Sequence, residues 1–208
     1  MKTFDEKNAT ADELWAYYME EYENQNPIAN NLFNNYYEKI SRILKQIDSG
    51  CKILEVGCAA GESSRRIHSL LNGQYFEVSE YEGRLVKKLI ESNPPFKVTQ
   101  ESVYEMQRND KEFDCVFLLE VLEHLDNPEA ALKELYRVAS RYVVVSVPNE
   151  PLWSTLNLLR GKYISNLGNT PGHINHWSPR AFKKLVSKFG KILEVYKPFP
   201  WTIIFSEA

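Results

Sequence analysis

From residue 51 onwards, short apolar runs alternate with amphipathic segments, and this alternation narrows the choice of fold. The predicted strands are residues 51–56, 74–78, 96–100, 113–119, 141–147, 191–197 and 201–207. The predicted helices between them are residues 61–71, 82–92, 127–139 and 178–189. Nearly continuous apolar strands that alternate with helices are typical of a parallel sheet covered on both faces. The sequence therefore predicts an α/β fold.

The two ends of the chain add to this core. Residues 12–23 and 31–47 have apolar residues at helical intervals, and Asn26-Pro27 separates them, so we expect a helical cap over residues 1–49. The last two predicted strands are expected to form a hairpin-like pair at one edge of the sheet. With no internal repeat and no flexible linker, residues 1–208 are expected to form a single domain.

Charge and composition exclude several classes of protein. The chain has 28 acidic and 25 basic residues, a formal charge of −3, which offers no broad attraction for nucleic acid. Its three cysteines fit neither a disulfide framework nor a zinc cluster. No apolar run approaches the ~18 residues of a membrane span, and the first residues include acids. We expect a cytoplasmic protein without membrane insertion; the sequence does not indicate its oligomeric state.

The loop after the first predicted strand, LEVGCAAGESS, lies where open α/β sheets bind their ligands. A dinucleotide site requires glycines at positions 57, 59 and 62, but this chain has Ala59 and Glu62. The methyl group of Ala59 obstructs close approach of a pyrophosphate, and the carboxylate of Glu62 opposes its charge at a helix N-terminus. NAD is therefore disfavoured.

S-adenosylmethionine fits this loop better because it carries a cationic sulfonium and no phosphate. Glu55 is expected to face the amino group of its methionine portion, while Gly57 and Gly61 allow a tight turn beneath it. Glu77, 20 residues after Gly57, is expected to end the second strand and to accept both ribose hydroxyls.

LEVGCAAGESS, FEVSE, FDCVFLLEVLEHLDNPEAALKELYRV and VVVSVPN together resemble a class I S-adenosylmethionine-dependent methyltransferase across about residues 50–150. EVLEHL and PGHINHWSPRAF most resemble the ubiquinone-biosynthesis type of small-molecule O-methyltransferase. The resemblance implies a Rossmann-like, seven-stranded, mostly parallel sheet. It also implies a cofactor-binding core over 50–148 and an acceptor-side segment with the final strands over 149–208. The cofactor-lining residues that it adds are Cys58, Ala59, Ser102, Leu119 and Glu120.

Three positions depart from the family pattern. Ala59 replaces the usual middle glycine, which requires a negative φ at that residue. Glu77 stands where aspartate is commoner. Where the family often has an acid that meets the adenine amino group, either Glu101 or Ser102 aligns, and the spacing favours Ser102.

Asn93-Pro94-Pro95-Phe96 matches a catalytic tetrad of amino-methyltransferases. In those enzymes the tetrad ends the fourth strand, but here it follows a predicted helix and precedes the third strand. Prolines just beyond a helix are a stop signal. We therefore interpret it as a connection.

Methyl transfer to a hydroxyl requires alignment of the acceptor and a base for its proton. Histidine is the natural base, and the resemblance favours His124, after the fourth strand, and His173, in the segment TPGHINHW. The possible metal ligands Glu120, Glu123 and His124 all come from one short stretch of the chain and do not converge from separate segments. We therefore expect no catalytic metal.

The sequence thus predicts an enzyme that methylates a small molecule, most readily at oxygen. Aromatic residues before position 23 and after position 148 favour an aromatic or lipid-like acceptor; they are Trp15, Tyr17, Tyr18, Tyr22, Trp153, Tyr163 and Trp177. Two alternatives stay open. One is a methyltransferase acting on a sugar, carboxylate or amine; the other is a non-catalytic partner protein that binds the cofactor.

Overall fold

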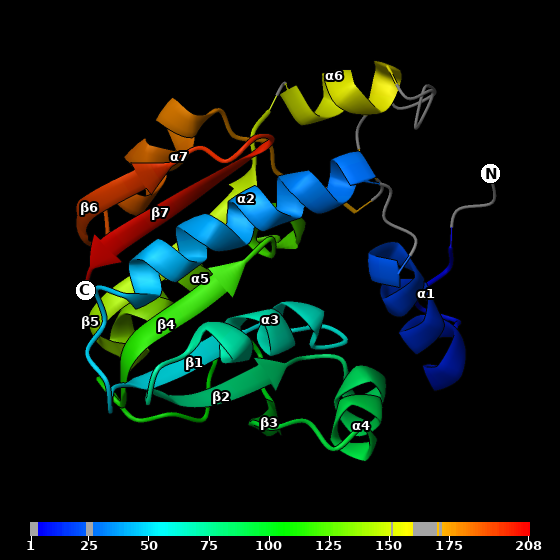
Figure 1. The fold of residues 1–208 in the computed structure, drawn as a ribbon, viewed down its shortest axis with the longest axis horizontal. Helices are drawn as coiled ribbons and strands as arrows, with labels where there is room; N and C mark the ends of the chain where they lie inside the picture. Colours follow the sequence, from blue (N-terminus) through cyan, green and yellow to red (C-terminus); the bar gives the residue numbers. More distant parts are fainter. Residues whose placement is uncertain (1–3, 24–26, 151, 160–169, 171) are drawn as a thin grey trace. The chain divides into compact units, whose positions relative to one another are not determined.

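The protein was analysed as a computed structural model, which describes residues 4–23, 27–150, 152–159, 170 and 172–208 (Figure 1). Seven strands form one sheet in the order β3-β2-β1-β4-β5-β7-β6. The predicted α/β fold with a mostly parallel, Rossmann-like sheet is confirmed. The chain divides into two compact units, Met1–Gln107 and Arg108–Ala208.

In its described residues, the first unit contains three parallel strands and four helices. Its elements are α1 (Ala11–Glu23), α2 (Pro27–Leu44), β1 (Lys52–Val56), α3 (Glu62–Leu70), β2 (Tyr75–Glu80), α4 (Gly83–Glu91) and β3 (Lys97–Gln100). β2 lies between β1 and β3 and pairs with both in parallel. The carboxyl ends of these strands therefore lie at one edge of the unit.

The part of the second unit that the structure describes contains four strands. Its elements are β4 (Phe113–Leu119), the short 3-10 helix η1 (Leu122–His124), α5 (Pro128–Val138), β5 (Ala139–Pro148), α6 (Leu152–Leu159), α7 (Pro179–Val186), β6 (Lys191–Tyr196) and β7 (Trp201–Glu207). β4 and β5 are parallel, and β7 pairs antiparallel with both β5 and β6. The expected antiparallel pair at one edge of the sheet is confirmed.

The N-terminal helix α1 packs on α4 in the first unit. α1 begins with a capping box, in which Thr10 Oγ1 accepts from the Glu13 amide and the Glu13 carboxylate accepts from the Thr10 amide. The Arg84 guanidinium of α4 donates to the carbonyl oxygen of Ala9, and Lys88 pairs with Asp12. These contacts fix the first helix of the predicted cap.

β2 is longer than the sequence predicted, and the difference bears on the site. The strand continues past residue 78 because Ser79 pairs with Val56 of β1 and with Thr99 of β3. Ser79 is fully buried although it is polar. Glu77 is consequently the third residue of β2, and Glu80 is the last. The expectation that Glu77 ends the strand was wrong.

The tetrad that begins at Asn93 is a connection, as predicted. It joins α4 to β3, and the Asn93 amide donates to the carbonyl oxygen of Ile90 at the helix end. Pro94, Pro95 and Phe96 line an open pocket of about 510 Å³ beside Tyr75, the first residue of β2. That pocket is therefore at the amino ends of the strands. In the described part of the chain, no helix has the length and apolar character needed to cross a bilayer.

Candidate functional site

The loop Gly57–Gly61 follows β1 in the first unit and is anchored to β2. The amides of Gly57 and Cys58 both donate to the carbonyl oxygen of Ser79, at 2.8 and 3.1 Å. Gly57 and Gly61 have φ values of 75° and 79°, which glycine adopts readily. A Cβ at position 61 would also lie 2.7 Å from Leu89 Cδ1. Glycine at both positions of the predicted tight turn therefore avoids backbone strain.

Ala59 lies in the same loop with a φ of 47°, so the expectation of a negative φ at this residue was wrong. A left-handed conformation costs an L-residue roughly 1–2 kcal/mol. The conformation is held from outside the loop, because the Ala59 amide donates to Glu80 Oε2 at 2.8 Å. The loop is thus fixed by a carboxylate at the end of β2.

Glu80 occupies the position at which the sequence analysis placed Glu77. Its second oxygen, Oε1, accepts from the Glu82 amide at 2.9 Å, so the carboxylate links the two loops that follow β1 and β2. A carboxylate has about four lone-pair sites, and further donors can bind. The signal that could have identified Glu80 is a second acid three residues after Glu77, in FEVSE.

Glu77 has a different environment. It is 5% exposed, and its Oε1 accepts from the Tyr75 hydroxyl at 2.7 Å and from Lys97 Nζ at 3.2 Å. Tyr75 precedes it on β2, and Lys97 is its register partner on β3. These contacts connect β2 with β3.

Glu55 is a buried carboxyl group, 1% exposed, on β1. Ser63 Oγ and Ser64 Oγ in the first turn of α3 donate to it at 2.7 and 2.5 Å. Burial raises the pKa of Glu55 to about 7, and the two serine hydrogen bonds only partly oppose this rise. Glu55 therefore changes charge near neutral pH.

The other predicted cofactor residues of the first unit lie near the same strand ends. Cys58 is buried, and desolvation followed by the charge of Glu55 raises the pKa of its thiol well above the ordinary value. Glu101 is 8% exposed, and its amide donates to the carbonyl oxygen of Glu80. Ser102 is half-buried, and its Oγ accepts from the Tyr104 amide at 3.3 Å. Which of these two meets adenine stays a prediction.

In the second unit, Leu119 and Glu120 lie at the end of β4. Glu120 has a φ of 58°, and its Oε1 accepts from Ser146 Oγ of β5 at 2.6 Å. The Glu120 amide donates to the carbonyl oxygen of Ser146 at 3.2 Å. Burial raises the pKa of Glu120 to about 8, against the lowering effect of hydrogen bonds from Ser146 and Trp201.

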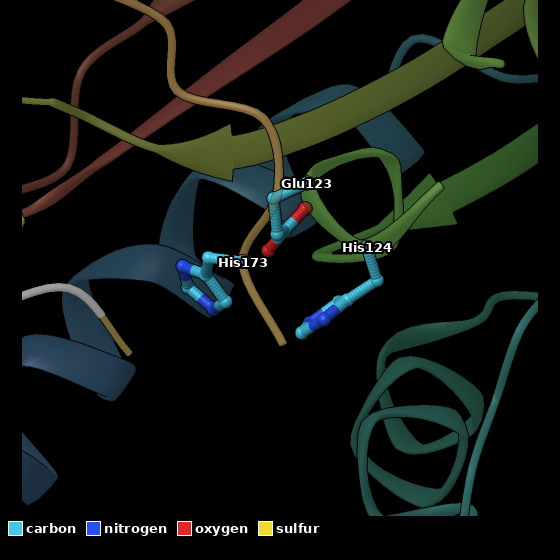
Figure 2. A group of neighbouring side chains, drawn as sticks. All are labelled: Glu123, His124 and His173. Carbon is cyan, nitrogen blue, oxygen red and sulfur yellow. The ribbon is translucent and has the colours of Figure 1, made fainter. Parts of the chain in front are cut away.

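Glu123, His124 and His173 form a second cluster in this unit, and Figure 2 shows their side chains directed toward one another. One potential ligand atom from each lies within 4.8 Å of the others. Glu123 is 2% exposed, and burial, followed by the charge of Glu120, raises its pKa well above the ordinary value. Burial lowers the pKa of His173 to about 4, and the charges of His124 and His176 add to this effect.

Backbone hydrogen bonds bring His173 to this cluster. The amides of Ile174 and Asn175 donate to the carbonyl oxygen of Glu123 at 2.9 and 3.0 Å. His124 Nδ1 lies 3.0 Å from the carbonyl oxygen of Gly172. The ring centroids of His124 and His173 are 4.8 Å apart. The two predicted catalytic histidines are thus neighbours. The argument against a metal, that its candidate ligands are contiguous, does not hold.

The aromatic residues proposed to enclose an acceptor are distributed over both units. Tyr17 stacks on Phe4 in the first unit, and in the second Trp153 Nε1 donates to Thr170 Oγ1 at 2.9 Å. Trp177 packs beside Phe182. The Tyr22 side chain and Tyr163 lie outside the described residues. Their role in acceptor binding stays a prediction.

The fold occurs in solved methyltransferase structures. A S-adenosylmethionine-dependent methyltransferase from Aquifex aeolicus is 15% identical, with a TM-score of 0.63 over 80% of this chain and 87% of that one. Magnesium protoporphyrin IX methyltransferase from Synechocystis, solved with S-adenosylhomocysteine, is 15% identical, with a TM-score of 0.63 over 88% of each chain. A possible histamine N-methyltransferase from Thermotoga maritima is 17% identical, with a TM-score of 0.62 over 93% and 98%. The fold is that of S-adenosylmethionine-dependent methyltransferases.

A sequence match that covers most of the chain shows the family to which the protein belongs. Residues 28–193 match the model of the methyltransferase domain family, and the chain therefore belongs to that family. It is a methyltransferase of the S-adenosylmethionine-dependent class, as the sequence predicted. No curated protein matches the chain. The branch related to ubiquinone biosynthesis stays a prediction.

Proposed function

We propose that this methyltransferase acts on a small molecule and transfers the methyl group to an oxygen atom. The observation that supports this proposal is the cluster of Glu123, His124 and His173, in which three acid–base groups converge; burial raises the pKa of Glu123 and lowers that of His173. Such groups are concentrated at functional sites. Oxygen acceptors need them because a hydroxyl must lose its proton during transfer.

The cofactor is assigned to the loops of the first unit. We infer that Glu80, at the end of β2, accepts both ribose hydroxyls, in place of Glu77. Glu55 would face the ammonium group of the methionine portion, and the positive charge would favour its ionised form. Ser102 or Glu101 would meet the adenine amino group. The roles of Leu119 and Glu120, which lie in the second unit, stay predictions from the sequence.

The reaction is an in-line displacement. The acceptor oxygen forms a bond to the methyl carbon while the carbon–sulfur bond breaks, and neutral S-adenosylhomocysteine leaves. His124 and His173 would serve the acceptor hydroxyl and its proton. With a pKa of about 4, His173 is neutral at pH 7 and suited to accept a hydrogen bond.

The acceptor itself requires experiment, because one fold serves many acceptors. Solved neighbours include a porphyrin methyltransferase and a possible histamine methyltransferase. We expect a screen of phenols, alcohols, sugars, carboxylic acids and amines to yield S-adenosylhomocysteine with an oxygen acceptor. Turnover confined to amines would contradict transfer to oxygen. Cofactor binding without turnover in any class would favour the non-catalytic alternative.

Once an acceptor is known, the variants His124→Ala and His173→Ala test the proposed role of the cluster. Each is expected to lower kcat by about 100-fold or more, within the range for loss of an acid–base group. Cofactor affinity should stay unchanged, because neither residue is assigned to the cofactor. Full turnover in both variants would exclude the cluster from the reaction.

A further inference from the structure

We propose that Asn175 is a positioning residue, which sets the register of residues 172–177 against η1 and thereby holds the His173 ring beside His124. The placement of the ring is argued from contacts within the second unit alone. Its consequence for turnover rests on the proposed function, in which the two histidines serve the acceptor hydroxyl. Asn175 would act on the reaction through His173.

The side chain of Asn175 is bound to both ends of the short helix that carries His124. Its Nδ2 donates to the carbonyl oxygen of Leu122 at 3.3 Å and to that of Leu125 at 2.6 Å. Leu122 is the first residue of η1, and Leu125 follows its last residue. Both partners only accept hydrogen bonds, so a side chain with two N–H donors on one atom satisfies them together. Serine offers one donor at this position, and aspartate offers none.

Side chains of residues 172–177 alternate between the two faces of the segment. The half-buried ones are those of His173, Asn175 and Trp177, and the intervening residues are exposed. A period of two is that of an extended chain, in which a slip of one residue turns every side chain to the opposite face. A slip would therefore direct the His173 ring away from His124.

Burial of apolar side chains opposes the observed register near His173. Ile174, which lies between His173 and Asn175, is 55% exposed, and a slip of one residue would turn it toward the half-buried face. Trp177 packs beside Phe182 and favours the observed register at the far end of the segment. It lies four residues beyond His173, however, so the intervening residues need a contact of their own.

The backbone hydrogen bonds hold the segment at η1 but do not select its register. The amides of Ile174 and Asn175 donate to the carbonyl oxygen of Glu123 at 2.9 and 3.0 Å. Every residue except proline carries such an amide, so a neighbouring residue would make the same bonds after a slip. The Asn175 side chain, by contrast, would turn away from both carbonyl oxygens that it binds. It is therefore the contact that distinguishes the observed register.

The register decides the environment of the His173 ring. Figure 2 shows this ring beside Glu123 and His124 of η1. Burial lowers the pKa of His173 to about 4, and the charges of His124 and His176 add to this effect. A released ring would gain contact with water, and its pKa would rise toward the ordinary value of 6.5. The ring would also leave the position from which it serves the acceptor.

The test is the nuclear Overhauser effect (NOE) between the ring protons of His124 and His173, measured in the full chain at pH 7. We expect this NOE in the wild type, whose ring centroids are 4.8 Å apart, and its loss in Asn175→Ala. Ile174→Ala is the matched control, because it makes the same truncation at the preceding residue, on the exposed face. It leaves both backbone hydrogen bonds in place and should retain the NOE.

Two further measurements separate positioning from loss of structure. Circular dichroism and the thermal response to S-adenosylhomocysteine should be retained in Asn175→Ala and Ile174→Ala, which establishes that these variants fold. Asn175→Ser keeps one donor and should give an NOE of intermediate strength. An NOE of full strength in Asn175→Ala, or its equal loss in Ile174→Ala, would overturn the positioning role.

Once an acceptor is known, turnover tests the consequence for the reaction. Asn175→Ala should lower kcat by about 100-fold, because a misplacement of about 1 Å can cost that much, whereas Ile174→Ala should match the wild type. The KM for S-adenosylmethionine should be unchanged in both variants. Full turnover in Asn175→Ala despite loss of the NOE would leave the placement of the ring standing and contradict the proposed function of the histidines.

Discussion

Glu80→Ala is expected to weaken the binding of S-adenosylhomocysteine by about 100-fold or more, measured by isothermal titration calorimetry. Hydrogen bonds to a charged group contribute roughly 1.5–3 kcal/mol each, so loss of two ribose contacts removes at least about 3 kcal/mol. The substitution also releases the amides of Ala59 and Glu82, which the carboxylate holds at 2.8 and 2.9 Å. Preorganisation of the loop after β1 is then lost as well.

Glu77→Gln is the matched control for this prediction. It changes an acid of the same strand, three residues earlier, whose carboxylate is occupied by Tyr75 and Lys97. Its effect should fall on stability, with cofactor affinity altered by less than about 0.5 kcal/mol, the usual range away from a site. An affinity loss in Glu77→Gln with none in Glu80→Ala would reverse the assignment of the ribose contact.

Glu55→Gln is expected to change how the stability of the free protein depends on pH. The pKa of Glu55 is raised to about 7 in the folded state, above the ordinary value of 4.5. Between these values the folded state retains a proton that the unfolded state releases, so stability falls as the pH rises. Between pH 5 and pH 8 this group should cost the wild type about 2–3 kcal/mol. Because glutamine does not titrate, the Glu55→Gln variant does not lose this stability as the pH rises.

The measurement is a pair of thermal melts of the wild type and Glu55→Gln at pH 5 and pH 8. The quantity compared is the Tm of the variant minus the Tm of the wild type. We expect this difference to be about 5–10 °C larger at pH 8 than at pH 5. Other titrating groups are common to both proteins and cancel in the comparison. A Tm difference that is the same at both pH values would show that Glu55 is ionised throughout.

Most of the fold was predictable because it depends on local patterns. The apolar runs from residue 113 and from residue 201 became β4 and β7 with unchanged boundaries. Such runs are long enough to define a buried strand by themselves. The end of β2 was not predictable in this way, since Ser79 and Glu80 are polar and their strand conformation depends on pairing with β1 and β3.

The site was predicted less completely because its parts depend on contacts between distant segments. The left-handed conformation of Ala59 is imposed by Glu80, 21 residues away. His173 reaches His124, 49 residues earlier in the chain, only because the amides of residues 174 and 175 bind the carbonyl oxygen of Glu123. The resemblance to the family identified both histidines as candidates but not their proximity.

Thermal unfolding in the presence of S-adenosylhomocysteine, compared with NAD at the same excess, tests whether this chain binds the cofactor of its class. At about a hundred times its dissociation constant, a ligand adds roughly 2.7 kcal/mol to stability. For a chain of this length, that corresponds to a rise in Tm of about 5–10 °C. We expect this rise with S-adenosylhomocysteine and none with NAD. A rise with NAD alone, or with neither ligand, would contradict the assignment of the loop after β1.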